Sequence, residues 1–444
     1  MSTFIVEGGA RLEGAIAVSG NKNEALPAIA AAMLSADTVT LRNFPDIGDV
    51  RNMLAIARHL GADVSGIRDG TVTIHAGTIT DDSLPVELSS KIRGSILFAS
   101  ALLLRHGHAV VPQPGGDSIG RRPLDTHFRV FEALGARLDV VRPSAETEQS
   151  VTLYSLSAPD GLTGADIFLD EASVTATENA LIAASGAKGR TTIANAASEP
   201  HVQGLCALLK AMGARIEGIG SNILTVEGTD RFTAVEHTLG SDYIEVGSLV
   251  GLAAATGSSL TLDNVDTEHL RMILFQFERL NVHLEIDHAA RRVAVPGDCK
   301  LRVRRDLGNA IPHIADGPWP AFPADLMSIL LVTATQAEGT CLIHEKMFES
   351  RLFFVDWLIS MGAQIVLCDP HRAVVAGASR LYAATITSPD IRAGMALLIA
   401  ALAAEGTSTI HNVVQIDRGY VAIDKRLNAL GASIARTPER RTNG

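Results

Sequence analysis

The 444-residue sequence lacks the features that mark several specialised classes of protein. Its longest apolar runs, near 96–104 and 395–404, are about half as long as an α-helix that crosses a membrane. Its four cysteines are scattered and include no CxxC pair, which indicates a reduced, cytoplasmic protein. The first residues lack the basic-then-apolar pattern of a secretion signal, because Glu7 interrupts it. Positive charge is not in excess, since the formal net charge is −11, which argues against nonspecific nucleic-acid binding.

What the sequence does contain is a repeat, whose clearest part is a helix-length apolar stretch that occurs six times. These stretches span residues 22–35, 91–104, 173–185, 242–255, 325–337 and 390–404. A helix that is apolar on nearly every side is expected in a protein core. The few charged residues lie almost only in the first turn, where unpaired backbone N–H groups favour bound anions. Lys22, Arg93, Asp325 and Arg392 are therefore candidate functional residues.

Each apolar stretch is followed by a strand and an amphipathic helix, and most of these helices end in the tag Leu/Met-Gly-Ala. The tag glycine is residue 61, 135, 213, 362 or 431, and the fourth copy reads Leu280-Asn281-Val282. A glycine at this place suits the left-handed conformation in which many helices end. Each unit spans roughly 70 to 80 residues, and six such units are more than one compact core normally holds.

We therefore predict an α/β (α+β) fold with three repeats in each of two domains and with buried inner helices. Domain 1 would span residues 22–235 and carry a lid loop at 112–122. Domain 2 would combine residues 236–444 with residues 1–21, whose two expected strands would complete it. The active-site cleft would lie between the two domains.

The lid prediction rests on residues 114–122, where three glycines flank an acid and two arginines. This composition is typical of a mobile loop that carries reactive groups, and a plain surface turn is the alternative interpretation. Gly115 and Gly120 have the spacing of a phosphate-binding P-loop. Arg121 and Arg122 replace the Lys-Ser/Thr pair of that motif, so the P-loop interpretation is rejected.

Two further arginines occupy notable places in the last repeat. Arg392 lies at the start of the last inner helix, and Arg418 lies just before the last outer helix. Arginine is the preferred bidentate partner of carboxylate and phosphate groups. A solvated surface charge is the alternative for either residue alone, and the recurrence at helix starts favours an anion-binding site.

Five segments together resemble the family of UDP-N-acetylglucosamine 1-carboxyvinyltransferases. They are Ser19–Pro27, which resembles the signature SGxKNxALP, together with Gly115–His127, Phe322–Asp325, Phe348–Arg351 and Ile416–Tyr420. The resemblance covers the whole chain in order. The sister family of enolpyruvylshikimate-phosphate synthases begins its first inner helix with a GSKSxxNR-type motif, which is absent here. The resemblance implies a two-domain inside-out α/β barrel of six βαβαββ repeats.

The same resemblance implies transfer of enolpyruvyl from phosphoenolpyruvate to the 3-hydroxyl of UDP-N-acetylglucosamine, with release of phosphate, in the first committed step of peptidoglycan synthesis. Asp325 would take the proton of the acceptor hydroxyl, although a helix N-cap is its alternative role. Asp117 would protonate C3 of phosphoenolpyruvate, and Lys22 would also serve catalysis. Phosphoenolpyruvate would be bound through charge-assisted bonds by Lys22, Asn23, Arg93, Arg122, Arg392 and Arg418. We expect no cofactor and no metal.

The nucleotide sugar would contact a strip of residues carried over from the family. These are Asn23, Arg93, Arg122, Pro123, Leu124, Asp125, His127, Ser173, Val174, Thr175, Asp325 and Met347. Several positions depart from the family pattern: Thr175 replaces the usual glycine, Glu171 stands where some members have lysine, and Ser350 replaces a common asparagine. Most members also carry a cysteine in place of Asp117, and fosfomycin alkylates that thiolate, so we expect this chain to be insensitive to the drug.

Two alternatives remain open from the sequence. One is an enolpyruvyl transferase that acts on a different nucleotide acceptor in secondary metabolism, which the departures from the strip allow. The other is a non-catalytic, clamp-like scaffold of six repeats, which would line its centre with many lysines and arginines. The expected partners are the two small-molecule substrates, with no nucleic acid and no membrane. Asp242 and Glu199 also match family positions, and a buried pairing with an arginine is the alternative explanation of both.

Overall fold

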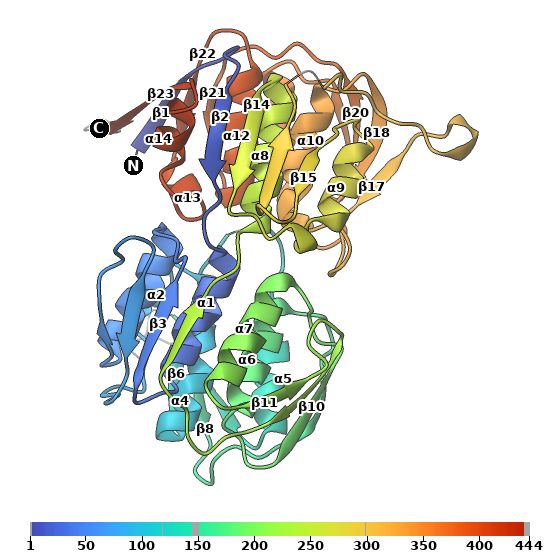
Figure 1. Ribbon diagram of the computed structural model, residues 1–444. Coiled ribbons are helices and arrows are strands. Elements are labelled where there is room, and N and C mark those ends of the chain that lie inside the picture. Colours follow the sequence, from blue (N-terminus) through green and yellow to red (C-terminus); the bar gives the residue numbers. More distant parts are fainter. Residues whose placement is uncertain (1, 118, 144–150, 298, 439–444) are drawn as a thin grey trace. The chain divides into compact units, whose positions relative to one another are not determined.

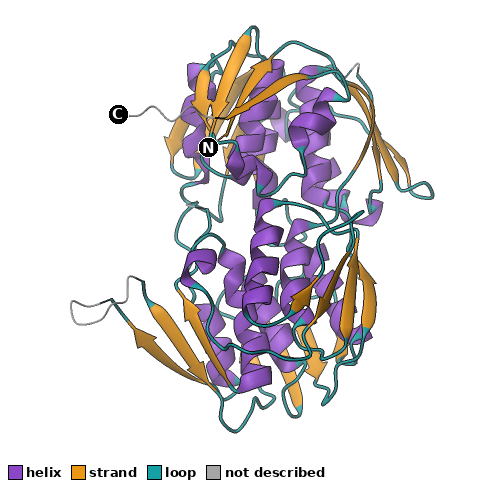
Figure 2. Cartoon of the chain, turned by 90° about the vertical axis from the view of Figure 1, so that its left-hand side faces the viewer, coloured by secondary structure: helices purple, strands orange, loops and turns teal. Residues whose placement is uncertain are grey.

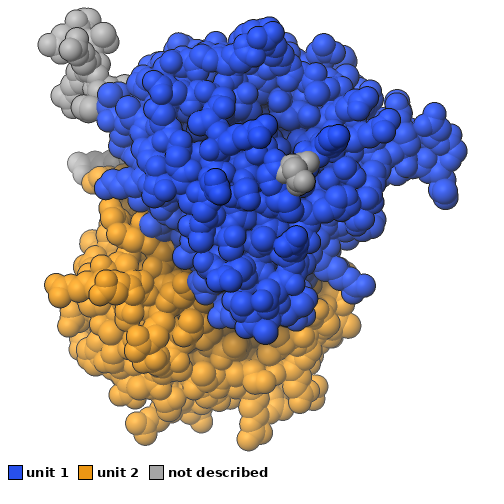
Figure 3. All heavy atoms as spheres, turned by 45° about the horizontal axis from the view of Figure 1, so that its top comes forward, with its two compact units in different colours: residues 1–19, 118–121, 241–444 blue, residues 20–117, 122–240 orange. Residues whose placement is uncertain are grey.

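The computed structural model describes residues 2–117, 119–143, 151–297 and 299–438 (Figure 1). The chain forms two compact units, which Figure 3 distinguishes by colour. Unit 1 comprises residues 1–19, 118–121 and 241–444, and unit 2 comprises residues 20–117 and 122–240. Within the described ranges, no helix is both long and apolar enough to span a membrane.

Unit 2 has three sheets in its described part, with the strand orders β13-β3-β5-β4, β6-β8-β7 and β11-β12-β10-β9. The strands are β3 (Thr38–Arg42), β4 (Asp63–Val64), β5 (Val72–His75), β6 (His108–Pro112), β7 (Arg137–Val141), β8 (Leu153–Ser157), β9 (Asp166–Phe168), β10 (Arg190–Ala194), β11 (Arg215–Glu217), β12 (Ile223–Glu227) and β13 (Val235–Thr238). The helices are α1 (Lys22–Ala32), α2 (Gly48–His59), α3 (Val86–Ser89), η1 (Arg93–Leu97), α4 (Phe98–His106), α5 (Asp125–Ala133), α6 (Val174–Ala184) and α7 (Pro200–Ala211). Because β13 pairs with β3, residues 235–238 belong to this unit.

Unit 1 also has three sheets among its described residues, with the orders β21-β22-β1-β23, β15-β16-β14-β2 and β17-β18-β20-β19. The strands are β1 (Ser2–Glu7), β2 (Glu13–Ala17), β14 (Ser259–Asp263), β15 (Glu285–Asp287), β16 (Arg292–Val295), β17 (His313–Ala315), β18 (Gly339–His344), β19 (Ile365–Asp369), β20 (Arg372–Gly377), β21 (Thr385–Thr387), β22 (Thr407–His411) and β23 (Ser433–Pro438). The helices are α8 (Tyr243–Thr256), η2 (Thr267–His269), α9 (Arg271–Glu278), η3 (Leu307–Asn309), η4 (Ala324–Leu326), α10 (Met327–Thr335), η5 (Arg351–Phe354), α11 (Val355–Ser360), α12 (Ile391–Ala403), α13 (Val414–Asp417) and α14 (Ile423–Asn428).

The six apolar stretches form the buried helices that the sequence predicts. In unit 2, α1, α4 and α6 contact one another, and in unit 1, α8, α10 and α12 do the same. Figure 2 shows the sheets of each unit on the outside of its helices. Close approach of the helices in unit 1 depends on glycine, because a Cβ at Gly251 would lie 2.5 Å from Cγ2 of Ile329.

The tag that ends the outer helices has the predicted left-handed backbone. Its positions have φ angles between 64° and 121°, at Gly61, Gly135, Gly213, Asn281, Gly362 and Gly431. Asparagine tolerates this conformation better than other residues with a side chain. The degenerate fourth copy therefore keeps the backbone geometry although it has lost the glycine.

A second repeated feature closes the ends of parallel strand pairs. In four sheets, the asparagine after the inner strand has a positive φ and donates from Nδ2 to the carbonyl oxygen of the residue after the neighbouring parallel strand. The bonds join Asn43 to Leu239, Asn195 to Leu169, Asn264 to Val18 and Asn412 to Ser388, at 2.9 to 3.0 Å. Each bond fixes where a strand ends and the loop toward the next helix begins.

Replacement of Asn195 by alanine is expected to destabilise the protein. The side-chain hydrogen bond to Leu169 is lost, and alanine at a φ of 58° is strained, so the free energy of unfolding should fall by about 2 kcal/mol. Chemical denaturation of Asn195→Ala measures the change, and Asn222→Ala, at an exposed position of the same unit, is the control. Equal stability of the two variants would contradict this role of the asparagine.

Candidate active site

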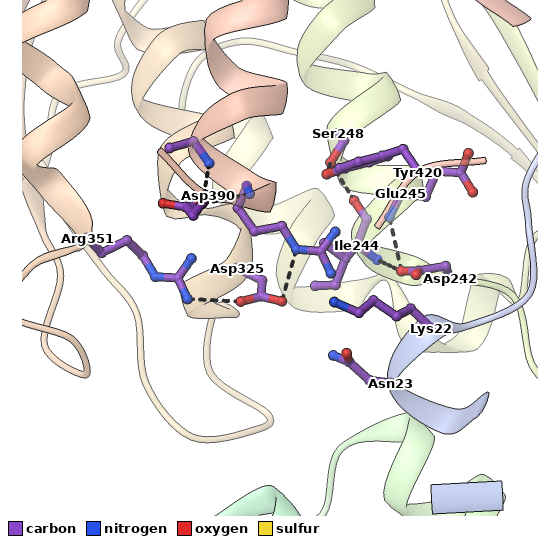
Figure 4. Close-up of polar contacts among 12 residues, drawn as sticks. Lys22, Asn23, Asp242, Ile244, Glu245, Ser248, Asp325, Arg351, Asp390 and Tyr420 are labelled. Atoms are coloured by element: carbon purple, nitrogen blue, oxygen red, sulfur yellow. Dashed lines mark hydrogen bonds and ion pairs between the residues drawn. The ribbon is translucent and has the colours of Figure 1, made fainter. Parts of the chain in front are cut away.

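The central feature of the candidate site in unit 1 is Asp325, which two arginines bind (Figure 4). Arg351 donates from Nη2 to Oδ1 of Asp325 at 3.0 Å, and Arg392 donates from Nε to Oδ2 at 3.1 Å. Both arginine side chains are buried, whereas the Asp325 side chain is 30% exposed. A carboxylate held by two guanidinium groups stays ionised, which is the form that can accept a proton.

The alternative role of Asp325 as a helix N-cap is wrong. Asp325 lies inside η4, and the cap residues of η4 and α10 are Pro323 and Leu326. The Asp325 side chain therefore binds two arginines, and it lies at the start of a buried helix, as its position in the sequence predicts.

The start of α12 presents Arg392 in a fixed direction. Asp390 is the N-cap of α12, and its Oδ1 accepts hydrogen bonds from the backbone N–H groups of Arg392 and Ala393. The guanidinium carbon of Arg392 lies 5.4 Å from the centre of the Tyr420 ring, and Tyr420 in turn contacts Oγ of Ser248 through its hydroxyl at 2.8 Å. Arg392 is thus held by a carboxylate, an aromatic ring and a helix cap.

Two other expected residues of unit 1 lie in loops and turns. The expectation that Arg418 directly precedes the last outer helix is wrong, because Arg418 is the C-cap residue of the extra short helix α13, and α14 begins only at Ile423. Its Nη1 donates to Oε1 of Gln415 at 2.7 Å. Met347 is 39% exposed between β18 and η5. Asp242 is the N-cap of α8 and accepts from the N–H groups of Ile244 and Glu245.

In unit 2, the start of α1 carries Lys22 next to an acid. Lys22 Nζ lies 2.8 Å from Oδ2 of Asp49, and both side chains are nearly buried. A cation at a helix amino terminus is unfavourable, and Asp49 of α2 compensates for this. The N-cap is Asn21, which accepts from the N–H groups of Asn23 and Glu24. The sequence analysis missed Asp49, whose partner lies in a different helix.

Gly20, in the first of the five motifs, is required by packing. A Cβ at this position would lie 1.6 Å from the carbonyl oxygen of Asn43, which no side chain allows. Gly20 is therefore needed for the path of the chain into α1, and the polar residues that follow it remain the candidates for binding.

Arg93 holds the carboxyl end of the expected lid. Its Nη2 donates to the carbonyl oxygens of Arg122 and Pro123 at 2.5 and 2.7 Å. Burial and the nearby charge of Arg122 lower the pKa of Arg93 to about 10. Arg93 therefore fixes the backbone at Arg122. Asp117 is half-buried in the same unit.

The tip of the expected lid, residues 119–121, belongs to unit 1. There the backbone N–H of Arg121 donates to Oε1 of Glu349 at 2.8 Å, and the carbonyl oxygen of Ile119 accepts from the N–H of Ser350 at 3.1 Å. Ser350, which replaces a common asparagine of the family motif, thus uses its backbone in this contact. Gly120 has a φ of 134°, a conformation that only glycine adopts readily.

The expected nucleotide strip in unit 2 is organised around a buried histidine. His127 is 1% exposed. Its Nδ1 accepts from Nδ2 of Asn179 at 2.8 Å, and its Nε2 contacts Oγ1 of Thr175 at 3.2 Å. Burial, Arg93 and Arg122 lower the pKa of His127 to about 3, so the ring is neutral. Thr175, which departs from the family's glycine, is thereby explained as the partner of His127.

The other members of the strip lie at the starts of α5 and α6. Leu124 is buried as the N-cap of α5, and Asp125 is the exposed first residue of that helix. Ser173 is the N-cap of α6 and is followed by Val174. Pro123 and Val174 are half-buried.

Glu171, which stands where some family members have lysine, precedes α6. Its side chain is exposed overall, while its carboxyl is partly covered, and this covering and Asp170 raise the pKa of Glu171. The charge of Arg93 opposes that rise.

Each unit therefore brings part of the expected set together. Asp325 and Arg392 are in direct contact in unit 1, and in unit 2 Arg93 contacts Arg122 and Pro123 while His127 contacts Thr175. The expected set omitted Arg351, although it ends a recognised motif, and it also omitted Asn179 and Tyr420. Within the described parts of the chain, no group of three or more His, Cys, Asp or Glu residues could hold a metal ion.

Comparison with known proteins decides the family. The family model described as EPSP synthase (3-phosphoshikimate 1-carboxyvinyltransferase) matches residues 6–427. A UDP-N-acetylglucosamine 1-carboxyvinyltransferase of Bradyrhizobium diazoefficiens is 53% identical over 439 residues, which cover 99% of both chains. A protein of the same name from Bacteroides thetaiotaomicron is 48% identical and covers 98% of this chain and 100% of its own. The chain belongs to the UDP-N-acetylglucosamine 1-carboxyvinyltransferase family. The resemblance drawn from the five motifs is thus confirmed.

Solved structures confirm the mixed α/β fold of this family member. The enolpyruvyl transferase NikO from Streptomyces tendae matches with a TM-score of 0.85 at 25% identity, over 99% of both chains. The EPSP synthase of Acinetobacter baumannii matches with a TM-score of 0.72 at 18% identity, over 99% of this chain and 100% of that one. The fold is therefore shared with proteins whose sequence identity to this chain is as low as 18%.

The neutral, buried state of His127 predicts a loss of stability in acid. The native state keeps this ring unprotonated down to a pKa of about 3, whereas in the unfolded chain it gains a proton below about pH 6.5. Stability is therefore lost as the pH falls from about 6.5 toward 3, and the loss at pH 5 should be about 2 kcal/mol. Urea unfolding at pH 7 and pH 5 measures it, and His127→Gln, which does not titrate, should lose correspondingly less than the wild type. Identical losses in the two proteins would show that His127 is not responsible.

Proposed function

We propose that the chain transfers enolpyruvyl from phosphoenolpyruvate to the 3-hydroxyl of UDP-N-acetylglucosamine by addition and elimination, releasing phosphate in the first committed step of peptidoglycan biosynthesis. The observation that carries this proposal is a sequence identity of 53% to two relatives, over 98–99% of this chain. Both relatives are named UDP-N-acetylglucosamine 1-carboxyvinyltransferase. The substrates are then phosphoenolpyruvate and the nucleotide sugar. The acceptor hydroxyl attacks C2 as it loses its proton, and C3 of the enol gains one.

The arrangement around Asp325 supports its role as the base. It is a partly exposed, ionised carboxylate whose direction is fixed by Arg351 and Arg392. A base within reach of the acceptor hydroxyl takes its proton as the C–O bond forms. Asp117, from the lid, supplies the proton to C3 in this proposal, and one proton leaves the resulting methyl group when phosphate is eliminated.

The anionic donor needs several cations, which we assign to both units. Lys22 and Arg122 of unit 2 and Arg392 and Arg418 of unit 1 neutralise its phosphate and carboxylate through charge-assisted bonds. Asn23 supports Lys22 from the next position of α1. We assign Arg93 an indirect part, because its guanidinium already binds the backbone at Arg122 and Pro123.

The nucleotide is assigned to the starts of α5 and α6 in unit 2 and to Met347 in unit 1. Backbone N–H groups at helix starts favour a diphosphate, and Ser173, Val174 and Thr175 form such a start. The neutral His127 acts here by holding Thr175 and not by its charge. Pro123, Leu124 and Asp125 complete the strip on α5.

We also propose that the three sheets and three inner helices of each unit are copies of one βαβαββ repeat, arranged as an inside-out α/β barrel. The recurrence of the left-handed tag and of the asparagine that closes a parallel strand pair supports this. Six copies of one supersecondary unit explain why both features recur at the same place.

Phosphate release tests the proposal directly. Wild-type protein mixed with phosphoenolpyruvate and UDP-N-acetylglucosamine should release phosphate, and Asp325→Asn should release it roughly 100- to 10,000-fold more slowly. Asp356→Asn, which removes an exposed acid of α11, is the matched control and should behave as wild type.

Circular dichroism shows whether each variant is folded. Near-normal turnover by Asp325→Asn would remove Asp325 from the mechanism. Release only with another nucleotide acceptor would move the assignment to a different substrate, and no release with any acceptor would leave a scaffold.

Asp117 predicts the response to fosfomycin. A carboxylate is a poor nucleophile toward the epoxide that the cysteine of most family members attacks, so the wild type should keep its activity after incubation with the drug. Asp117→Cys should retain turnover and lose it progressively in fosfomycin, with the drug's mass added to the protein. Mass spectrometry of both proteins checks this, and covalent modification of the wild type at the lid would refute the expectation.

A further inference from the structure

The sheet β17-β18-β20-β19 departs from the repeat at the ends of its two parallel strands. In four other sheets of the described chain, an asparagine follows the inner strand and donates to the carbonyl oxygen of the residue that follows the parallel neighbour. In this sheet, Glu345 follows the inner strand β18 and Asp316 follows its parallel neighbour β17. Glu345 thus replaces the asparagine donor, and a second acid, Asp316, stands at the position whose backbone carbonyl accepts in the other sheets, in the same repeat that contributes Asp325.

The two acids are buried neighbours, because Asp316 and Glu345 directly follow the paired residues Ala315 and His344, and the N–H of Lys346 donates to Asp316. Glu345 has no exposed surface, and Asp316 is 3% exposed. One oxygen of each has a backbone donor, since Oε1 of Glu345 accepts from Phe348 N–H and Oδ1 of Asp316 accepts from Lys346 N–H. Among the described residues, no donor reaches the second oxygens, Oε2 of Glu345 and Oδ2 of Asp316.

Two buried carboxylates side by side repel each other, and a single proton between them removes the repulsion. The geometry therefore already contains a place for one proton. The asparagines at the corresponding positions of the other sheets carry no charge, so this repulsion does not arise there.

Arg351 connects this acid pair to the proposed base. Its Nη2 is 3.0 Å from Oδ1 of Asp325, whereas its Nε is 3.8 Å from Oε2 of Glu345, which is beyond hydrogen-bonding distance. The guanidinium is thus directed at one of the two acids although it lies beside both. An ionised Glu345 would compete with Asp325 for it.

We propose that Glu345 and Asp316 share one proton and that the neutral Glu345 is a positioning residue, which leaves the charge of Arg351 for Asp325. The inference rests on the proposed function, in which Asp325 is the base. Glu345 touches neither substrate in this scheme and acts only through Arg351.

The groups around Glu345 determine how this arrangement responds to pH. Burial and the hydrogen bond to Asp316 raise the pKa of Glu345 to about 9, and the charge of Arg351 opposes the rise. The neighbouring strand β20 is preceded by His371, whose Nδ1 lies 2.7 Å from the backbone carbonyl oxygen of Glu345. The carboxyl is therefore neutral at pH 7 and ionises as the pH rises through about 9.

The other charged groups that act on Arg351 are Asp325, Asp390 and Arg392. Ionisation of Glu345 adds an anion 3.8 Å from Nε of Arg351, which then competes with Asp325 for the guanidinium. Loss of this alignment should lower kcat, because the base loses one of the two bonds that orient it.

The test compares the pH dependence of kcat in wild type, Asp316→Asn and the double variant Asp316→Asn/Glu345→Gln. Asp316→Asn removes the anion that keeps the proton on Glu345, so Glu345 ionises at lower pH. The kcat of this variant should fall about tenfold per pH unit above the lowered pKa, in a range where that of the wild type is constant. The double variant is neutral at both positions, and its kcat should stay within about threefold of wild type across that range.

A merely structural role of the acid pair predicts a different result, in which kcat of both variants is reduced by a constant factor at every pH. That outcome overturns the proposal. The matched control is Glu338→Gln, which removes an exposed glutamate just before β18 and should leave the pH profile of wild type unchanged.

Infrared spectroscopy tests the shared proton without any turnover. At pH 7, the difference spectrum between wild type and Glu345→Gln should show the carbonyl band of a buried protonated carboxyl group, and the difference spectrum between wild type and Glu338→Gln should lack it. Absence of the first difference band overturns the proposal even if the enzyme is active. Failure of the proposed function is recognised separately, because wild type would then release no phosphate from phosphoenolpyruvate and UDP-N-acetylglucosamine.

Discussion

The interaction on which unit 1 depends is the pairing of two buried guanidinium groups with one shared carboxylate. Arg351 and Arg392 are each 4% exposed, and both bind Asp325. Leaving either charge without its partner would cost about 3–5 kcal/mol, the typical penalty for breaking a buried pair. The three residues come from η5, α12 and η4, so this electrostatic requirement also fixes the starts of α10 and α12. The charges that stabilise the fold of unit 1 are therefore the same ones to which we assign the chemistry.

Repetition makes the special positions of this fold visible. An asparagine closes the parallel strand pair in four sheets of the described chain, and a left-handed residue ends six outer helices even where glycine has become Asn281. The asparagines bond backbone carbonyl oxygens, and the left-handed residues allow the chain to turn at the end of a helix. Both features are therefore expected wherever the same backbone path is repeated. A departure from them needs another cause. Glu345 and Asp316 depart from the pattern next to Arg351, in the repeat that carries Asp325.

The sequence was sufficient for what depends on local pattern. The buried helices, the left-handed tag and the charged residues at helix starts follow from apolar spacing and composition. Contacts between distant segments could not be read in this way. Asn179 meets His127 across 52 positions, and Arg351 meets Asp325 across 26. Arg418 was misplaced because α13, a single turn, has too few residues to show a helical period.

On the proposed function, the pairing of Asp325 with two arginines links binding to catalysis. A carboxylate between two guanidinium groups is a weak base, because protonation would forfeit both ion pairs. Phosphoenolpyruvate brings negative charge to Arg392, and this charge competes with Asp325 for the same cation. The carboxylate then becomes more basic when the donor is bound, which is when a proton must be taken from the acceptor. Arg351 keeps Asp325 oriented meanwhile, and it can do so because its other acidic neighbour, Glu345, is neutral. The base is thus strengthened by the substrate that needs it, without losing its direction.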